Sequence, residues 1–210
     1  MLRNGHRLTS LALGLGLAAP AATGLLQPAP VPPPAGSPAP PVSEFAVDSV
    51  HSGAFFGVRH FGVSNFYGRF NHVEGTIHYD PGDPASSSVE IRVRADSVDT
   101  NATDRDEHLK GPDFFNAKRY PWLSFKSTKV EKGEGDILNV TGDLSIRGQT
   151  KSLTVPVRVL GEGETPQGYK AGFEARFQIL RSEFGVRYGL PDALGDEVDI
   201  LLAIEAVRKA

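Results

Sequence analysis

The sequence predicts an all-β domain, an antiparallel barrel with a short helix or an ordered loop near residues 99–110. Three observations predict this fold class. Apolar residues recur at every second position along most of the chain, the links between these runs are mostly short, and each run has one polar face. Closing the sheet into a barrel removes the exposed strand edges of an open sheet. A sandwich of two sheets is the competing architecture.

The first runs are rich in aromatic residues and contain a change of phase. Apolar residues occupy even positions at Phe66 and Phe70 and odd positions at Val73 and Ile77. One extra residue near 71–72 would explain the change. Such a β-bulge increases the twist of a strand and is common where sheets curl into barrels.

The middle of the chain contains regular alternation. In residues 89–96, Val, Ile, Val and Ala alternate with Glu, Arg, Arg and Asp, as expected for a half-buried strand. Residues 138–146 and 153–159 carry two further apolar rows. The residues between them, 147–150, predict a turn, so the two rows form a β-hairpin.

The last two runs, residues 169–179 and 198–206, bring the count to about eight strands. Residues 99–110 are polar and rich in helix formers, so we expect them to cover one end of the barrel. A barrel of about eight strands has an interior that side chains fill, or that holds one small ligand, as in lipocalins. The predicted fold is therefore a lipocalin-like eight-stranded antiparallel barrel.

Residues 1–21 have the pattern of a secretory signal peptide. Basic residues precede an apolar run that ends in the small-residue cleavage site Ala19-Pro20-Ala21. We therefore expect export to the periplasm or the extracellular space. An uncleaved membrane anchor is the lesser alternative, because the weakly apolar stretch continues to Leu26.

Residues 22–43 are dominated by Pro and Ala and predict a disordered linker, because such a segment cannot bury a core. Residues 44–210 lack any further linker and predict one barrel domain.

Composition excludes several classes of function. The 22 Lys and Arg residues nearly balance the 25 Asp and Glu residues, so we expect no nucleic-acid partner. The absence of cysteine excludes disulfides, thiolate metal sites and a Cys nucleophile. No serine lies in a G-x-S-x-G motif, and no histidine has neighbours that complete a recognisable metal ligand set. We therefore expect no catalytic residue, no metal and no cofactor.

Two polar residues stand at the ends of inward-facing apolar rows, His60 and Arg181. At the mouth of a barrel both would contact a polar or phosphorylated head group, Arg181 through paired hydrogen bonds and His60 as a titratable donor. In the alternative, they close the rim of the barrel. Arg181 would then pair with Glu183 or Asp99, and His60 would donate to backbone carbonyls.

The inward-facing apolar rows also define a candidate pocket lining. Rings and aliphatic side chains around a cavity with few polar groups at its mouth are the usual form of a ligand pocket. The alternative is a core filled by phenylalanine. The candidate lining residues are Phe56, Val58, Phe70, Phe125, Phe173, Phe177, Ile179, Ile200 and Leu202.

Ordered motifs along the domain resemble the YceI family. They include Phe-Ala-Val-Asp-Ser-Val-His-Ser at 45–52, Phe-Phe-Asn at 114–116, Gly-Asp-Leu-Ser-Ile-Arg-Gly at 142–148 and Arg-Ser-Glu-Phe-Gly at 181–185. The resemblance implies an extracytoplasmic, lipocalin-like barrel that accommodates a polyisoprenoid or a comparable long amphiphile, without an established enzymatic step. One departure is Asn116, where the family commonly has Asp.

From these observations we expect an exported lipid-binding protein that sequesters or carries a long-chain isoprenoid, polyprenyl or quinone-like. Two alternatives remain open. One is a hydrolase- or isomerase-type enzyme with His60 or His51 as the base, and the other is a solid barrel used for protein contacts. The sequence also leaves room for a homodimer and for a transient contact with a membrane.

Overall fold

The computed structural model describes residues 42–209. The predicted signal peptide, residues 1–21, and all but the last two residues of the predicted linker lie outside them. The first strand begins at Ser43. None of the helices in the described part of the chain is long and apolar enough to cross a membrane.

Residues 42–209 form eleven strand segments, one α-helix and three short 3₁₀ helices. In chain order they are β1 (Ser43–Val47), β2 (Gly53–His60), β3 (Ser64–Phe70), β4 (Val73–Tyr79), η1 (Pro84–Ser86), β5 (Ser88–Arg94), η2 (Ala95–Ser97), β6 (Val98–Asp99), α1 (Thr103–Lys110), β7 (Trp122–Lys132), β8 (Ile137–Ile146), β9 (Gln149–Thr165), β10 (Gly168–Leu180), η3 (Arg181–Phe184) and β11 (Leu194–Arg208).

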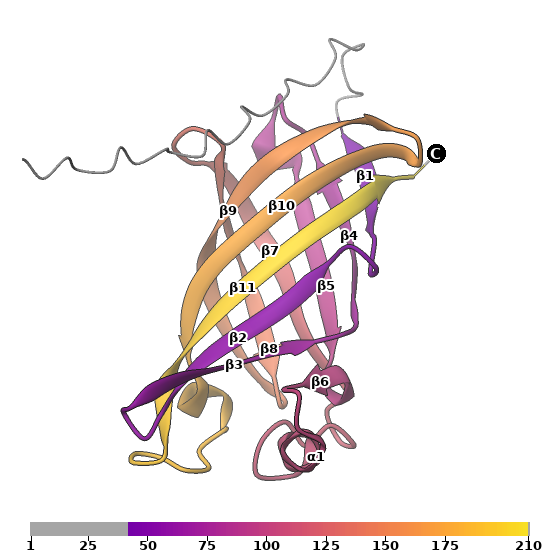
Figure 1. The fold of residues 1–210 in the computed structure, drawn as a ribbon. Helices are drawn as coiled ribbons and strands as arrows, with labels where there is room; N and C mark the ends of the chain where they lie inside the picture. Colours follow the sequence, from indigo (N-terminus) through magenta and orange to yellow (C-terminus); the bar gives the residue numbers. More distant parts are fainter. Residues whose placement is uncertain (1–41, 210) are drawn as a thin grey trace, which may run out of the picture. The chain divides into compact units, whose positions relative to one another are not determined.

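The eleven segments form a closed barrel (Figure 1). They occupy eight strand positions, since two segments share each of three positions. β1 and β2 share the position beside β11. β4 and β3 pair with them in the next position, and β5 and β6 continue beside that. Since β1 pairs with both β4 and β11, the sheet closes on itself. The predicted eight-stranded antiparallel barrel is confirmed, and the sandwich alternative is wrong.

The change of apolar phase coincides with a break between β3 and β4. Phe70 ends β3 and Val73 begins β4, and both side chains are buried in the barrel. Asn71 and His72 leave the ladder between them, and the Asn71 N–H donates to the carbonyl of Ser97 over 3.0 Å. Ser97 belongs to η2, which interrupts the neighbouring position. The predicted single-residue bulge is therefore a two-residue break, shared by two adjacent positions.

The predicted hairpin is β8–β9. Arg147 and Gly148 have φ values of 52° and 76°, and positive φ at both central residues is what a two-residue type I′ turn requires. Gln149 and Thr150, which the sequence assigned to the turn, already belong to β9. The two-residue turn suffices because its twist matches that of the flanking strands.

The predicted short helix is confirmed as α1, and Figure 1 shows it at the lower end of the barrel. Asp104 and Asp106 lie in its first turn, where negative charge is favourable. The Asp106 carboxylate also accepts a hydrogen bond from the Thr100 N–H over 2.9 Å. This bond fixes the chain between β6 and the helix, so that α1 stays at the barrel end.

Aromatic side chains pack together towards the opposite end of the barrel. The Phe45 ring is fully buried and lies 6.3 Å from the Tyr169 ring, centroid to centroid. The Tyr79 and Phe173 rings meet edge to face at 5.5 Å.

Candidate functional site

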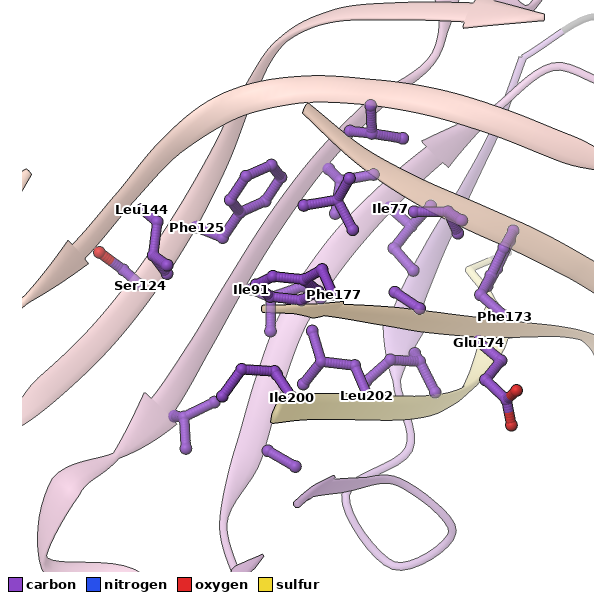
Figure 2. Close-up of a pocket in the computed structure, with 18 of the residues that line it drawn as sticks. Ile77, Ile91, Ser124, Phe125, Leu144, Phe173, Glu174, Phe177, Ile200 and Leu202 are labelled. Carbon is purple, nitrogen blue, oxygen red and sulfur yellow. The ribbon is translucent and has the colours of Figure 1, made fainter. Parts of the chain in front are cut away.

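An apolar cavity of about 140 Å³ lies inside the barrel. Inward-facing residues from most of the strands line it, as the period of two along each strand dictates. Figure 2 shows Ile91, Phe177 and Ile200, which come from β5, β10 and β11, around the same space. The Glu174 carboxylate instead accepts a hydrogen bond from exposed Arg176, so it points away from the interior. The barrel is therefore hollow rather than filled.

A second cavity, of about 450 Å³, lies at the end of the barrel that carries α1. We call it the mouth cavity. It is lined by β2, β3, α1 and the chain from Arg181 to Leu194, and several of its lining groups are polar. Six side chains line both cavities and therefore lie between them: Phe56, Phe70, Leu123, Ile146, Ile179 and Ile200.

All nine apolar residues selected from the sequence lie in these linings. Eight line the inner cavity, and Val58 lines the mouth cavity. Their contact with a ligand stays a prediction. The selection missed the contributions of β5, β8 and β9, although the apolar rows of these strands were visible in the sequence. The missed lining residues include Ile91, Val93, Val140, Val155 and Val157.

Arg181 lines the mouth cavity, but its donors face the backbone. The side chain is buried, and its Nε donates to the Gly195 carbonyl over 2.7 Å. Nη1 donates to the carbonyls of Val186 and Tyr188, over 3.1 and 2.9 Å. Nη2 donates to the Leu194 carbonyl over 2.9 Å. One guanidinium thus holds together the loop between β10 and β11.

The ion pair expected for Arg181 with Glu183 or Asp99 is wrong. Asp99 accepts hydrogen bonds from Asn71 and Arg69 instead. Burial lowers the pKa of Arg181, and the negative charge of Asp196 opposes that shift. With four carbonyls bound, Arg181 has little capacity left for a head group, so its role as a ligand contact stays a prediction.

His60 lies at the exposed end of β2, on the rim of the mouth cavity. The centroid of its ring is 4.4 Å from that of Phe61. Within residues 42–209, its imidazole makes no hydrogen bond to a backbone carbonyl, in contrast to the alternative weighed from the sequence. Its nitrogens therefore remain accessible to a ligand at the mouth.

Helix α1 adds two polar groups that the sequence reasoning missed, Arg105 and His108. With Leu109, they occupy positions i, i+3 and i+4, which share one helix face. This spacing was the signal in the sequence that could have placed these residues on one face of the helix. Arg105 donates from Nε and Nη2 to Thr100, each over 2.8 Å, and its guanidinium lies 4.3 Å from the centroid of the Phe66 ring. The mouth thus carries a fixed cation beside an aromatic wall.

A separate group of ionisable side chains lies outside both cavities. Ligand atoms of Asp48, His51 and Glu205 lie within 4.8 Å of one another, a grouping hidden in the sequence because Glu205 is distant along the chain. The Lys170 ammonium, however, lies 2.5 Å from Glu205 Oε1 and 3.7 Å from Asp48 Oδ2. The hydrogen bond with His51 is the main cause of the lowered pKa of Asp48. We assign the group as an ion-pair network that fixes the β1–β2 turn to β11.

Comparison with known proteins gives one consistent result. A family model described as the YceI-like domain matches residues 45–206. Protein YceI of Escherichia coli O6:H1 is 39% identical over 170 residues, which cover 80% of this chain and 88% of the relative. The crystal structure of BcnA from Burkholderia cenocepacia is 28% identical, with a TM-score of 0.71 over 77% of this chain and 99% of BcnA.

A second solved structure is similar in fold alone. It is described as a polyisoprenoid binding domain from Saccharophagus degradans, implicated in plant cell wall breakdown. Its TM-score is 0.64 at 12% identity, and the match covers 79% of this chain and 98% of that domain.

Proposed function

The chain belongs to the YceI-like family, and we propose that it is an exported carrier that holds a long-chain isoprenoid lipid, of polyprenyl or quinone type, inside its barrel. The observation that carries the proposal is the apolar inner cavity, which adjoins a mouth cavity with a few polar groups and shares six lining residues with it. A deep apolar space with polar groups at one end suits a ligand with a long tail and a small head. The polyisoprenoid binding domain of Saccharophagus degradans, which shares the fold, supports the same choice.

The apolar tail would provide most of the affinity. Each buried CH₂-sized group contributes about 0.8 kcal/mol, so a chain of several isoprene units binds without any specific polar contact. The buried Phe45, Tyr79 and Phe173 rings, which lie away from the mouth, would limit how deep the tail reaches. The length of the cavity therefore selects for tail length.

The head group would remain at the mouth. The side chains there that carry donors include His60, Arg105 and His108, and Arg105 contributes a guanidinium group. His108 has Asp113 as a partner, with Nε2 and Oδ2 3.0 Å apart. We therefore assign Arg105 and His60 as the head-group contacts, and give Arg181 the structural role of holding the loop.

The proposal includes no chemical step. Of the two histidines considered as a base, His51 lies in the ion-pair network outside both cavities. His60 lies on the rim, where it meets the head of a ligand and solvent together. Incubation with isoprenoid lipids should leave them unchanged, and turnover that a His60→Ala variant loses would instead establish an enzyme.

The decisive experiment is native mass spectrometry of the mature domain purified without detergent, followed by solvent extraction and identification of the released species. We expect one isoprenoid lipid per chain. In Ala175→Phe, a ring enters the inner cavity, and occupancy should fall. The matched control is Arg176→Phe, one residue along β10, whose side chain is exposed.

Two results would contradict the carrier. One is an apo mass that persists after incubation with polyprenyl and quinone lipids, and the other is equal occupancy in both variants with retained folding. The first would favour a domain used for protein contacts. The same spectra report whether the chain is a monomer or a homodimer.

Export is part of the proposal, because residues 1–21 carry the signal-peptide pattern. Expression of the full chain in a Gram-negative host should give a mature protein in the periplasmic fraction, with Ala22 at its N-terminus. A full-length chain that stays with the membrane would instead establish the anchor.

A further inference from the structure

Three of the most exposed apolar side chains lie at the mouth end of the barrel. Val63 is 81% exposed, Phe61 is 61% exposed and Tyr188 is 50% exposed. Phe61 and Val63 belong to the turn between β2 and β3, which reaches beyond the barrel wall at the lower end of Figure 1. Tyr188 belongs to the loop between β10 and β11. We call these three residues the apolar rim.

The two segments of the apolar rim are fixed to each other. The Phe61 N–H donates to the Ala193 carbonyl over 2.9 Å, which joins the turn to the β10–β11 loop. Within the turn, the Val63 N–H donates to the His60 carbonyl over 3.0 Å. These bonds hold the backbone of the turn on both sides, and the Phe61 and Val63 side chains are exposed on it.

The apolar rim is continuous with the ligand path. Phe61 and Tyr188 line the mouth cavity while half or more of each residue is exposed. An apolar chain that enters or leaves the barrel through the mouth cavity therefore passes these two rings. A chain transferred through water at this point would expose its full apolar surface, at a cost that rises with each CH₂ group. Contact between the apolar rim and a bilayer removes that exposure.

The charges beside the apolar rim fit a lipid surface. Arg59 Nη2 donates to the Gly62 carbonyl over 2.9 Å, which places a guanidinium at the tip of the turn. Arg187, exposed, precedes Tyr188. Asp192 lies in the same loop, so the local net charge is small. Exposed aromatic side chains flanked by arginines are typical of the interface between water and lipid head groups.

We propose that the apolar rim, Phe61, Val63 and Tyr188, is a docking surface for the interfacial region of a phospholipid bilayer, through which the barrel is loaded and emptied. Loading and emptying of the barrel rest on the proposed function, but binding of the apolar rim to a bilayer is measured separately from lipid uptake. Since apolar insertion dominates over charge, we expect docking to uncharged bilayers and only a weak dependence on salt.

The test measures partition of the mature domain onto phosphatidylcholine vesicles, with and without phosphatidylglycerol, by flotation. In the rim variant, Phe61→Asn with Val63→Ser, partition should fall about ten-fold, because two apolar side chains no longer insert. Asn suits position 61 because the residue there has φ of 48°, a region that Asn tolerates. The control, Val50→Ser with Leu160→Ser, removes two equally exposed apolar side chains away from the mouth.

Thermal unfolding of all three proteins verifies that each is folded. We expect the control to partition as the parent protein does, and the rim variant to transfer isoprenoid between donor and acceptor vesicles more slowly. Absence of vesicle binding by the parent protein, or equal losses in the rim variant and the control, would overturn the proposal. Rim-dependent partition of a domain that takes up no isoprenoid would preserve the docking surface and reject the carrier.

Discussion

The buried guanidinium of Arg181 donates a hydrogen bond from Nη1 to the carbonyl oxygen of Tyr188, over 2.9 Å. The bond links a residue at the start of η3 with the backbone of a residue whose ring lies on the rim. Three further carbonyls of the same loop and of β11 accept hydrogen bonds from this side chain. Arg181 therefore holds the backbone on one side of the mouth in place.

Replacing Arg181 with lysine should destabilise the protein by about 3 kcal/mol, because an ammonium cannot reach four carbonyls and leaves buried acceptors unpaired. Chemical unfolding followed by the fluorescence of Trp122, the single tryptophan, measures the change. Arg187→Lys in the same loop is the control, and since Arg187 is exposed its effect should stay within about 0.5 kcal/mol. Unchanged stability together with lost lipid binding would make Arg181 a ligand contact.

Asp196 should make the stability of the mouth loop sensitive to acid. Burial raises the pKa of its carboxyl, but the hydrogen bonds from the Ser182 hydroxyl and N–H, over 2.6 and 2.8 Å, and the positive charges of Arg181 and Arg187 together lower it by more. Because the folded pKa is depressed, the stabilisation is complete above the ordinary carboxyl pKa of about 4 and is lost as the pH falls through the folded value.

We therefore expect Asp196→Asn to lower the free energy of unfolding by about 1 to 2 kcal/mol at pH 7, and by progressively less below about pH 4. Unfolding curves of both proteins across this range provide the measurement. Asp192→Asn, at an exposed position in the same loop, should show no such convergence. A difference that stays constant down to pH 2 would contradict the assignment.

Gly142 lies where β8 pairs with the irregular part of β7, and a side chain would not fit there. A Cβ atom would lie 2.5 Å from the Lys126 carbonyl oxygen and 2.6 Å from Phe125 Cζ. Gly142→Ala should therefore cost about 2 kcal/mol of stability. In Gly172→Ala the nearest atom lies 3.5 Å away, an ordinary contact, so that variant should be close to neutral. Equal thermal shifts in the two variants would reject the steric explanation.

Arg105 should distinguish between head groups. Arg105→Gln removes the cation at the mouth but keeps a donor, so binding of a polyprenyl phosphate should weaken several-fold, while binding of a neutral quinone should change little. Titration of the delipidated domain with each lipid measures both affinities. The control is Arg119→Gln, a nearby exposed arginine that does not line the mouth cavity. Equal losses for both lipids would assign Arg105 a structural role.

The apolar side chains that face the interior of the barrel were largely predictable from the sequence. Alternation along residues 169–179 placed Phe173, Phe177 and Ile179 on one face, and the structure has all three in the cavity linings. The phase change before Val73 was also visible, because the period of two is a property of each strand by itself. The break that causes it was not, since it depends on hydrogen bonds between Asn71 and the neighbouring η2.

By itself, the sequence determined the all-β class, the inward faces and the family, because strand alternation and ordered motifs are local properties of the chain. Only the tertiary structure decided that the barrel is hollow, that backbone carbonyls occupy Arg181, and that Arg105 of α1 reaches the mouth. The same holds for Asp48, which meets Glu205 only after β1 and β11 pair. These features depend on side chains that are distant in the sequence, and how closely such side chains pack is fixed only when the barrel closes.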